Sequence, residues 1–213
     1  MTSLEFRDRL ARRARRAKAP LTIPMLDPLE AYLRLLTQWN AKINLTSLPL
    51  DPPTDETFDR LLVEPIAASK RVDDTPAKWM DLGSGGGSPA VPLKIARPSV
   101  SLTMVESRER KSAFLREAVR VLELADALVV TARFEELATN PHFRSGYDFL
   151  TVRAVKADAE LYRTAAELLH PGGKLLMFRP AHSASPDPDG FRQIETVRLI
   201  DEPASFLTVL ARA

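Results

Sequence analysis

The sequence predicts an α/β fold: a Rossmann-like, seven-stranded and mostly parallel sheet with helices on both faces, preceded by an N-terminal helical extension. Three observations support this prediction. From residue 78 onwards, short apolar runs alternate with amphipathic stretches, a rhythm that implies right-handed crossovers between parallel strands. A glycine-rich loop at residues 83–87 follows the first apolar run and leads into a helix. Before residue 75, apolar side chains recur at helical spacing.

The N-terminal extension is expected to hold three helices. The first covers residues 3–18. The second runs over residues 27–43, where Asp27 can cap the helix and Pro28 suits its first position, because that position needs no N–H donor. The third covers about residues 54–70, with its apolar residues on one face.

Strands and helices alternate in the rest of the chain. The expected strands, in chain order, are 79–82, 102–106, 127–131, 148–152, 174–178, 195–200 and 206–211. The expected helices are one that follows the glycine loop and ends at Ala96, then 108–124 and 158–169. The Pro171-Gly172-Gly173 sequence predicts a turn before the fifth strand, and residues 181–190 predict a polar loop.

The composition excludes several classes of protein. With 213 residues and 45% hydrophobic content the chain can bury a core, and no apolar run approaches the ~20 residues of a membrane span. No apolar segment lies near the N-terminus, so we expect no secretory signal and a cytoplasmic protein. The absence of cysteine excludes disulfides, thiolate zinc sites and cysteine nucleophiles. His142, His170 and His182 lack metal-ligand spacing, so we expect neither a metal site nor a catalytic histidine.

Positive charge is concentrated at the N-terminus. Residues 1–20 contain seven basic and two acidic residues, a net charge of +5 in a chain whose total is +2. A basic arm on a neutral to acidic body can bind the phosphate backbone of a nucleic acid. A solvated and partly disordered terminus is an equally good interpretation of the same residues.

The glycine loop indicates a nucleoside-containing cofactor. Gly85-x-Gly87-x-x-Ala90 matches the dinucleotide-binding pattern, which is a weak indication by itself. Asp81, two residues before Gly83, argues against a dinucleotide because its carboxylate would repel a diphosphate. The same carboxylate favours S-adenosylmethionine, whose ammonium and sulfonium groups are cations.

Later motifs support the same cofactor. Glu106 closes the second strand and can accept both ribose hydroxyls, although it can also be a simple helix N-terminal charge. Phe134 and Glu135 follow the third strand, where they can flank an adenine and its amino group. Together with the turn at 171–173, these residues predict S-adenosylmethionine as the cofactor and a class I methyltransferase domain over residues 76–213, after a helical extension over 1–75.

A set of motifs between Tyr32 and Phe178 is more distinctive than any one of its members. The set consists of Trp39-Asn40 with Asn44-Leu45-Thr46-Ser47, the run from Asp81 to Pro89 with Val91-Pro92-Leu93, Glu106-Ser107, Arg110-Lys111, Phe114-Leu115-Arg116, Arg133-x-Glu135-Glu136 and Arg153-Ala154. In these motifs the chain resembles the bacterial small-subunit ribosomal RNA guanine-N7 methyltransferases of the glucose-inhibited division B type.

The resemblance implies an S-adenosylmethionine-dependent enzyme that methylates guanine N7 in 16S ribosomal RNA. Its partner would be ribosomal RNA or the small ribosomal subunit, with no membrane and no metal, and we expect a monomer. Guanine N7 carries an in-plane lone pair and no proton, so the transfer needs positioning rather than a general base. The cofactor contacts that the resemblance and the residue-by-residue reading predict are Asp81, Gly83, Gly85, Gly87, Ser88, Glu106, Phe134, Glu135 and Arg153.

Arg153 and Asn44 are the candidate catalytic residues. Arg153 ends the fourth strand and can clamp a base, a phosphate or the methionine carboxylate; the alternative is a structural ion pair with Asp148 or Asp158. Asn44 serves catalysis or ties the N-terminal helices to the cofactor loop. The aromatic residues Tyr32 and Trp39 are expected in the core rather than stacked on bases. A basic rim for RNA, or a solvated helix face, is expected from Lys94, Arg97, Arg108, Arg110, Lys111 and Arg116.

The chain departs from the family's pattern on the side expected to face RNA. Aligned from Arg60, Leu61 stands where the family usually has histidine, and Glu64-Pro65 stands where it has Asp-Ser. Arg179-Pro180 replaces Lys-Gly after the fifth strand, and Ser205 stands near an expected arginine. Two alternatives therefore stay open: a methyltransferase of this fold that acts on another RNA or a small molecule, and a non-catalytic nucleotide- or RNA-binding module.

Overall fold

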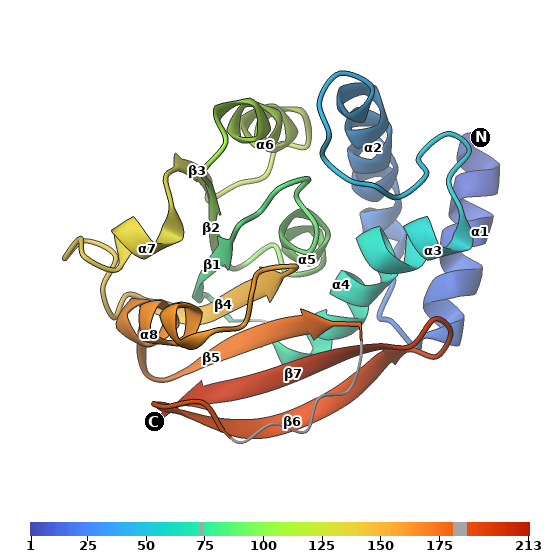
Figure 1. Cartoon of the computed structure of the whole chain (residues 1–213). Helices are drawn as coiled ribbons and strands as arrows, with labels where there is room; N and C mark the ends of the chain where they lie inside the picture. The colour runs from blue at the N-terminus through green and yellow to red at the C-terminus, as the bar shows by residue number, and fades with distance from the viewer. Residues whose placement is uncertain (73–74, 181–186) are drawn as a thin grey trace.

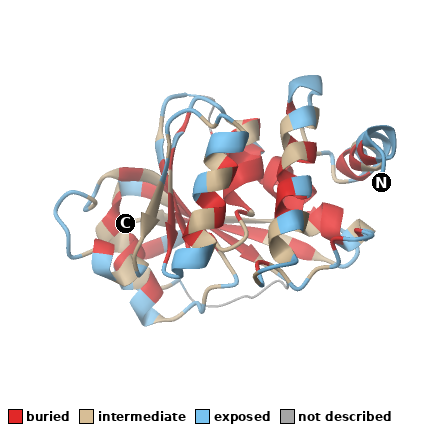
Figure 2. Cartoon of the chain, turned by 90° about the horizontal axis from the view of Figure 1, so that it is seen from above, coloured by how far each residue is buried: buried red, intermediate tan, exposed pale blue. Residues whose placement is uncertain are grey.

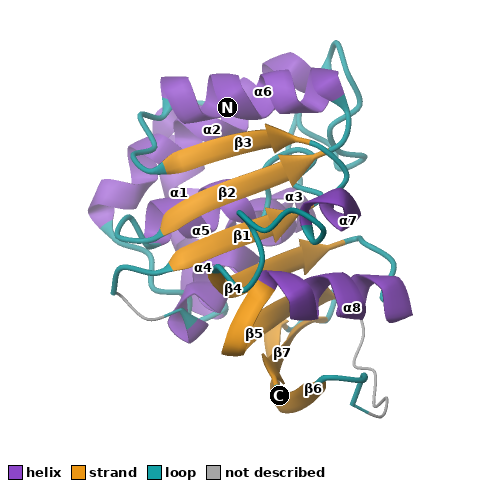
Figure 3. Cartoon of the chain, turned by 90° about the vertical axis from the view of Figure 1, so that its left-hand side faces the viewer, coloured by secondary structure: helices purple, strands orange, loops and turns teal. Residues whose placement is uncertain are grey.

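A single seven-stranded sheet forms the centre of the molecule (Figure 3). The computed structural model describes residues 1–72, 75–180 and 187–213, so His182 and most of the loop predicted over 181–190 lie outside the described residues. The strand order is β3-β2-β1-β4-β5-β7-β6. The strands are β1 (Lys78–Leu82), β2 (Ser101–Glu106), β3 (Ala127–Thr131), β4 (Tyr147–Arg153), β5 (Leu169–Arg179), β6 (Phe191–Ile200) and β7 (Ser205–Arg212).

The sheet is mostly parallel, as predicted. Strands β1 to β5 pair in parallel, and β7 pairs antiparallel with both β5 and β6. The chain builds outward from β1 to β2 and β3, then crosses back to place β4 on the other side of β1. The resulting reversal of strand order opens a crevice at the carboxyl ends of β1 and β4, the usual ligand site of such sheets.

Helices cover both faces of the sheet (Figure 1). Within β1, Trp79 packs into the hydrophobic cluster shared with the N-terminal helices, α5 (Ala90–Ala96) and α6 (Glu109–Val121). Its neighbour Met80 packs into the opposite cluster, with α7 (Phe134–Leu137) and α8 (Ala159–Leu168). This alternation is the period of two that strands impose, and Figure 2 shows the buried strands between helices whose outer faces are exposed.

Helix α1 (Ser3–Arg16) is packed against the body, so the interpretation of this segment as a disordered terminus is wrong. Phe6 and Leu10 are fully buried. Ion pairs also fix the helix: Arg7 pairs with Asp27, Arg9 with Asp55, and Arg13 with both Asp55 and Asp59.

Helix α2 (Ile23–Asn40) begins four residues earlier than predicted. Thr22 is extended and precedes Pro24 in the first turn, so this pair starts the helix and Pro28 lies inside it. The prediction of Asp27 as the cap was therefore wrong, because the chain offers two similar start signals and packing selects the first. Tyr32 is fully buried in the core, and the half-buried Trp39 packs against that core, edge-on to Phe114 with ring centroids 5.9 Å apart.

The third predicted helix is present but changes its winding along its length. It consists of α3 (Asp55–Phe58), a π-helical turn η1 (Asp59–Val63), α4 (Glu64–Ala68) and a 3₁₀ turn η2 (Ser69–Arg71). A continuous α-helix over 54–70 was therefore wrong in detail. Pro65 has no N–H to donate to the carbonyl of Leu61, four residues before it, and this disrupts the regular ladder.

Two other local predictions need correction. Pro171-Gly172-Gly173 lies within β5 rather than before it, and the pairing with β4 shifts register between Tyr147 and Phe149 to accommodate it. The short helix α7 was not predicted, because four residues are too few to show a helical period.

Buried residues of α1, α2 and the sheet form one contiguous cluster. The division of the chain at residue 75 into an extension and a methyltransferase domain therefore stays a prediction about sequence organisation. No helix among residues 1–72, 75–180 and 187–213 is long and apolar enough to cross a membrane.

Candidate active site

A cavity of about 770 Å³ opens at the carboxyl edge of the sheet. Its walls come from the segments that follow β1, β2 and β4, from the loop after α2, and from η1. Of the predicted site residues, it brings together Asn44, Gly83, Gly85, Ser88, Glu106 and Arg153. Asp81 and Gly87 lie in the same β1–α5 segment without lining the cavity, and Phe134 and Glu135 lie at the start of α7.

The glycine loop approaches the cavity with bare backbone. Gly83, Gly85 and Gly87 have φ angles of 73°, 52° and 84°, a region that side chains with a Cβ disfavour. A Cβ on Gly87 would lie 3.1 Å from Val91 Cγ2. The buried hydroxyl of Tyr32 in α2 donates to the Gly86 carbonyl at 2.6 Å, so the N-terminal helices hold this loop directly.

Asp81 is a buried carboxylate with one uncommitted oxygen. The indole Nε1 of Trp79 donates to Thr151 Oγ1 at 2.9 Å, and that hydroxyl donates to Asp81 Oδ1 at 2.5 Å. Oδ2 is buried and has no hydrogen-bond partner in the described structure. Burial raises the pKa of Asp81 to about 6, against the opposing effect of the Thr151 hydrogen bond. A cationic ligand group beside Oδ2 would restore the ionised form.

Glu106 is held in place by backbone donors. Its Oε2 accepts the N–H of Gly85 at 3.0 Å and its Oε1 accepts the N–H of Arg108 at 2.8 Å. Each oxygen retains lone pairs, and the residue lines the cavity at the end of β2. Glu106 therefore bonds to the residue that caps α6, as one interpretation of the sequence predicted, while its contact with a ribose stays a prediction.

Arg153 is anchored on several sides at the end of β4. Its Nη2 donates to Glu64 Oε2 at 2.8 Å, and its Nη1 donates to Ser88 Oγ at 3.0 Å and to the Arg60 carbonyl. The guanidinium lies over the Phe178 ring, 4.5 Å from its centroid. Burial lowers the pKa of Arg153, and the Glu64 carboxylate opposes that effect.

The ion pair predicted for Arg153 with Asp148 or Asp158 was wrong. Asp148 pairs with His170 at 2.8 Å, and Asp158 caps α8 by accepting the N–H of Leu161 at 3.1 Å. Asp148 and Asp158 are close to Arg153 in the sequence. The observed partner, Glu64, is distant in the chain but adjacent in space. Ala154, directly after Arg153, adopts a φ of 57°, an unusual conformation that turns the chain sharply at the cavity wall.

Comparisons with known proteins agree with this geometry. The profile of a family described as rRNA small subunit methyltransferase G matches residues 25–187. A protein of that name from Roseiflexus castenholzii is 39% identical over 71% of this chain and 63% of its own length. One from Stenotrophomonas maltophilia is 39% identical over 76% of this chain and 73% of its own. The chain belongs to this family.

Solved structures extend the likeness to the fold. TrmN from Thermus thermophilus has a TM-score of 0.53 and 22% identity over 70% of this chain and 49% of its own. A SAM dependent methyltransferase from Aquifex aeolicus has a TM-score of 0.54 and 13% identity over 70% of this chain and 89% of its own. Family and fold together confirm the predictions of a class I methyltransferase and of S-adenosylmethionine as its cofactor.

The site fits the cofactor of the rRNA small subunit methyltransferase G family. Buried polar atoms at or beside the cavity lack hydrogen-bond partners within the described residues: Asp81 Oδ2, Glu64 Oε1 and Arg153 Nε. A carboxylate, an acid that ends β2 and a guanidinium match the ammonium, ribose and carboxylate of S-adenosylmethionine in charge and donor type.

The structure bears on the two alternatives given for Asn44. Asn44 is exposed on the cavity wall, whereas Asn40 ties the loop to α2, because its Oδ1 accepts the N–H groups of Leu45 at 2.9 Å and Thr46 at 3.0 Å. The structural alternative offered for Asn44 thus belongs to Asn40, whose signal was present in the Trp39-Asn40 motif. For Phe134 and Glu135, contact with the adenine stays a prediction.

Sequence reasoning missed Thr151 and Glu64 as parts of the site. Thr151 lies in a strand that reads as a plain buried run, and its hydroxyl next to Asp81 follows from the pairing of β1 with β4. In the sequence Glu64 stands out only as a departure from the family's pattern. In the structure its carboxylate pairs with Arg153.

The predicted basic rim is only partly present. Arg108 and Lys111 line the cavity. Lys94 was assigned wrongly, since it is 2% exposed and its ammonium donates to the Pro98 carbonyl at 2.9 Å. Arg97 likewise donates to a backbone carbonyl at 2.9 Å. Lys94 thereby binds the turn that follows α5, and Arg97 ties this turn to the chain before β1 through the Val72 carbonyl.

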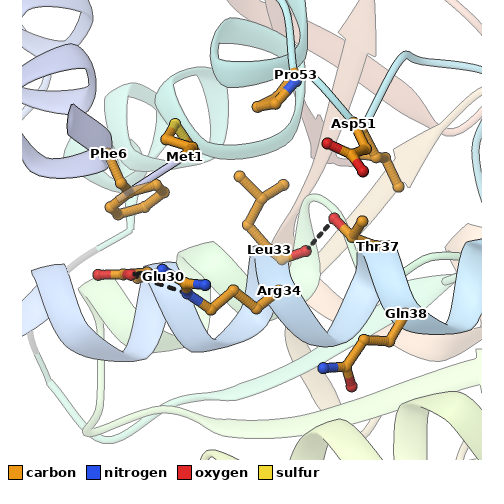
Figure 4. Close-up of a pocket in the computed structure, with 10 residues that line it drawn as sticks. Met1, Phe6, Glu30, Leu33, Arg34, Thr37, Gln38, Asp51 and Pro53 are labelled. Carbon is orange, nitrogen blue, oxygen red and sulfur yellow. Dashed lines mark hydrogen bonds and ion pairs between the residues drawn. The ribbon is translucent and has the colours of Figure 1, made fainter. Parts of the chain in front are cut away.

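A second cavity, of about 240 Å³, lies between α1, α2 and residues 50–53 (Figure 4). Phe6 and Leu33 point into it, and the Glu30–Arg34 ion pair lies at its side. It contains none of the predicted site residues and lies away from the carboxyl edge of the sheet. The described residues contain no group of three or more His, Asp or Glu side chains that could hold a metal ion.

Proposed function

We propose that the protein transfers the methyl group of S-adenosylmethionine to N7 of a guanine in small-subunit ribosomal RNA. The observation that carries the proposal is the cavity itself. It places the glycine backbone, Glu106 and Arg153 around one space, beside the free oxygen of Asp81, in a chain of the rRNA small subunit methyltransferase G family.

The residues of this site would act by positioning. When bound, S-adenosylmethionine supplies an electrophilic methyl group on a sulfonium. Guanine N7 presents a lone pair without a proton, so no side chain has to act as a base. Arg153, already held by Glu64 and Ser88, needs little further ordering to fix a ligand.

The charges around the cavity suit a reaction that leaves a cationic purine. Asp81 and Glu106 place negative charge near the cofactor, and Glu64 offsets the charge of Arg153. These carboxylates oppose the positive charge of Arg60, Arg108, Lys111 and Arg153 on the cavity wall, and so favour the charge that develops on the alkylated base.

Labelled S-adenosylmethionine tests the proposal directly. We expect label at guanine N7 when the protein is incubated with small ribosomal subunits that lack the modification, and no label on large subunits. Cofactor binding without labelled guanine in any ribosomal RNA would contradict it. Label on a transfer RNA or a small molecule would support the second candidate, which Leu61 favours because it lines the cavity where the family usually has histidine.

The outer face of α1 is proposed as a contact for the RNA backbone. Arg7, Arg9 and Arg13 are engaged in ion pairs, whereas Arg12, Arg15, Arg16 and Lys18 are exposed. Changing Arg12, Arg15 and Arg16 together to Glu should weaken RNA binding and lower the slope of log K against log salt by about 2 to 3. The matched control changes three exposed arginines that lie outside α1 and away from the cavity, Arg163, Arg192 and Arg198, to Glu, and should keep the parental slope. An unchanged slope for the Arg variant would exclude this contact.

The remaining assignments follow from the proposed substrate. A protein that modifies small ribosomal subunits acts in the cytoplasm, and we propose that it does so as a monomer. In sequence, residues 1–75 would serve as an RNA-facing extension and residues 76–213 as the methyltransferase domain.

A further inference from the structure

The π-helical turn η1 leaves the carbonyl of Arg60 without a helical donor. In an α-helix the N–H of Glu64 would bond to it, but that N–H donates to the Asp59 carbonyl, one residue earlier. In a π-helix the donor would come from residue 65, which is proline and has no N–H. The Arg60 carbonyl is therefore free to accept from outside the helix, and Arg153 Nη1 donates to it.

The carbonyl of Leu61 is affected by the same proline. Pro65 lies four residues after Leu61, so the ordinary α-helical bond to that carbonyl cannot form. Ser88 Oγ donates to it instead, at 2.9 Å, and in turn accepts from Arg153 Nη1 at 3.0 Å. The hydroxyl has one proton, and this arrangement uses it on the freed carbonyl.

Glu64, next to Pro65, completes the set of acceptors. Its carboxylate is 2% exposed and pairs with Arg153 at 2.8 Å, while its other oxygen lies 3.7 Å from Arg60 Nε. Arg153 thus meets a carboxylate and a freed carbonyl from one helical segment, and Ser88 joins a second freed carbonyl to it. A short stretch of chain before β1 sets the position of two residues predicted to contact the cofactor.

We propose that Glu64 and Pro65 are positioning residues for cofactor binding. Pro65 has no N–H, so the Arg60 and Leu61 carbonyls stay free to accept from other groups. Glu64 orients the Arg153 guanidinium, which donates to one of these carbonyls. The inference rests on the proposed function for its link to catalysis. π-Helical turns are frequent at functional sites because they redirect backbone groups out of the helix ladder. Here the redirected groups hold Ser88 and Arg153.

Pro65→Ala tests the role of the missing N–H. Alanine supplies a donor for the Leu61 carbonyl and favours the helix, so we expect an unchanged or higher Tm. In a regular α-helix the N–H of the introduced alanine would occupy the Leu61 carbonyl and the Glu64 N–H would return to the Arg60 carbonyl, so Ser88 and Arg153 would both lose their acceptors. Calorimetry with S-adenosylmethionine should therefore show Kd raised about tenfold or more. The matched control is Pro28→Ala, which makes the same change inside α2, away from the cavity, and should leave Kd as it is.

Glu64→Gln and Glu64→Asp test the carboxylate. Glutamine keeps the shape and removes the charge, so Kd for S-adenosylmethionine should rise about tenfold or more. Aspartate keeps the charge and should recover most of the affinity. Circular dichroism on each variant separates loss of fold from loss of orientation.

The calorimetric measurement needs no RNA, so its outcome is independent of the proposed acceptor. If the parent binds S-adenosylmethionine and methylates no RNA, the proposed function fails while the positioning role can still hold. Pro65→Ala with parental affinity would overturn the inference. So would a Pro65→Ala variant whose Tm and affinity fall together, since that would make the proline structural.

Discussion

Replacing Asp81 by Asn will weaken binding of S-adenosylmethionine and, at the same time, raise the melting temperature of the free protein above pH 7. The first effect follows from loss of the carboxylate whose Oδ2 has no partner in the described structure. We expect Kd to rise at least about tenfold, the loss of one charge-assisted interaction. The second effect follows from burial of an ionised group that only a ligand compensates.

The pH dependence gives the sign of the stability effect. Burial raises the pKa of Asp81 from 3.8 to about 6. Between these values the folded protein binds more protons than the unfolded chain, so its stability falls as pH rises through that window. The cost, roughly 2 to 3 kcal/mol, is then fully present above pH 6 and absent below pH 4. Asn cannot ionise, so the variant is not destabilised by a buried charge at this position.

Thermal unfolding from pH 5 to pH 8 measures this difference. The gap in Tm between Asp81→Asn and the parent should widen as pH rises to about 6 and stay constant above it, while Asp8→Asn on the exposed face of α1 should show no such trend. Cofactor affinity of the parent should fall as pH drops below about 6, with a flat profile for the variant. A variant less stable than the parent at pH 8 would contradict the assignment.

Replacing Arg13 by Ala will cost about 3 to 5 kcal/mol of unfolding free energy, because it leaves a buried carboxylate without its cation. Asp59 is 2% exposed, and its Oδ1 accepts from Arg13 Nε at 2.8 Å. Urea unfolding measures the loss. Arg7→Ala breaks an exposed pair with Asp27, whose side chains are 45% and 79% exposed, and should cost less than about 1 kcal/mol.

A double variant separates the contribution of the ion pair from the cost of leaving one buried charge unpaired. Arg13→Met combined with Asp59→Leu should recover most of the loss, because no buried charge is left unpaired. If Arg13→Ala costs no more than Arg7→Ala, the pair does not hold α1 to η1. Since Asp59 begins η1, the single variant should also weaken the cofactor site.

The position of the glycine loop and of Glu106 at the cavity was predictable because the information for it is local. The positive-φ glycines, Asp81 before them and Glu106 at the end of the next strand lie in short motifs whose geometry follows from a strand, a turn and a helix start. The same holds for the strands, whose predicted positions match the observed ones to within a few residues apart from the longer β5 and β6.

The parts that failed depend on contacts between distant segments. Glu64 and Arg153 meet across 89 residues of sequence, and no local pattern selects Glu64 over Asp148 or Asp158. The start of α2 at Thr22 and the π-helical turn each depend on where a proline sits in a packed helix. The sequence alone allows more than one such position, so it does not select the observed one. Lys94 shows the same limit, because nothing in its local sequence indicates that its ammonium will donate to the Pro98 carbonyl in the turn after α5.

The hydrogen-bonded chain from Trp79 through Thr151 to Asp81 links a fluorescent side chain to the proposed cofactor site. An indole responds to the electric field along its N–H bond, and this N–H points into a relay that ends at the carboxylate. Of the two tryptophans, Trp39 packs against Phe114 and lies outside that relay. We therefore expect the emission of Trp79 to change when a ligand fills the cavity, so that binding can be followed in real time without any label.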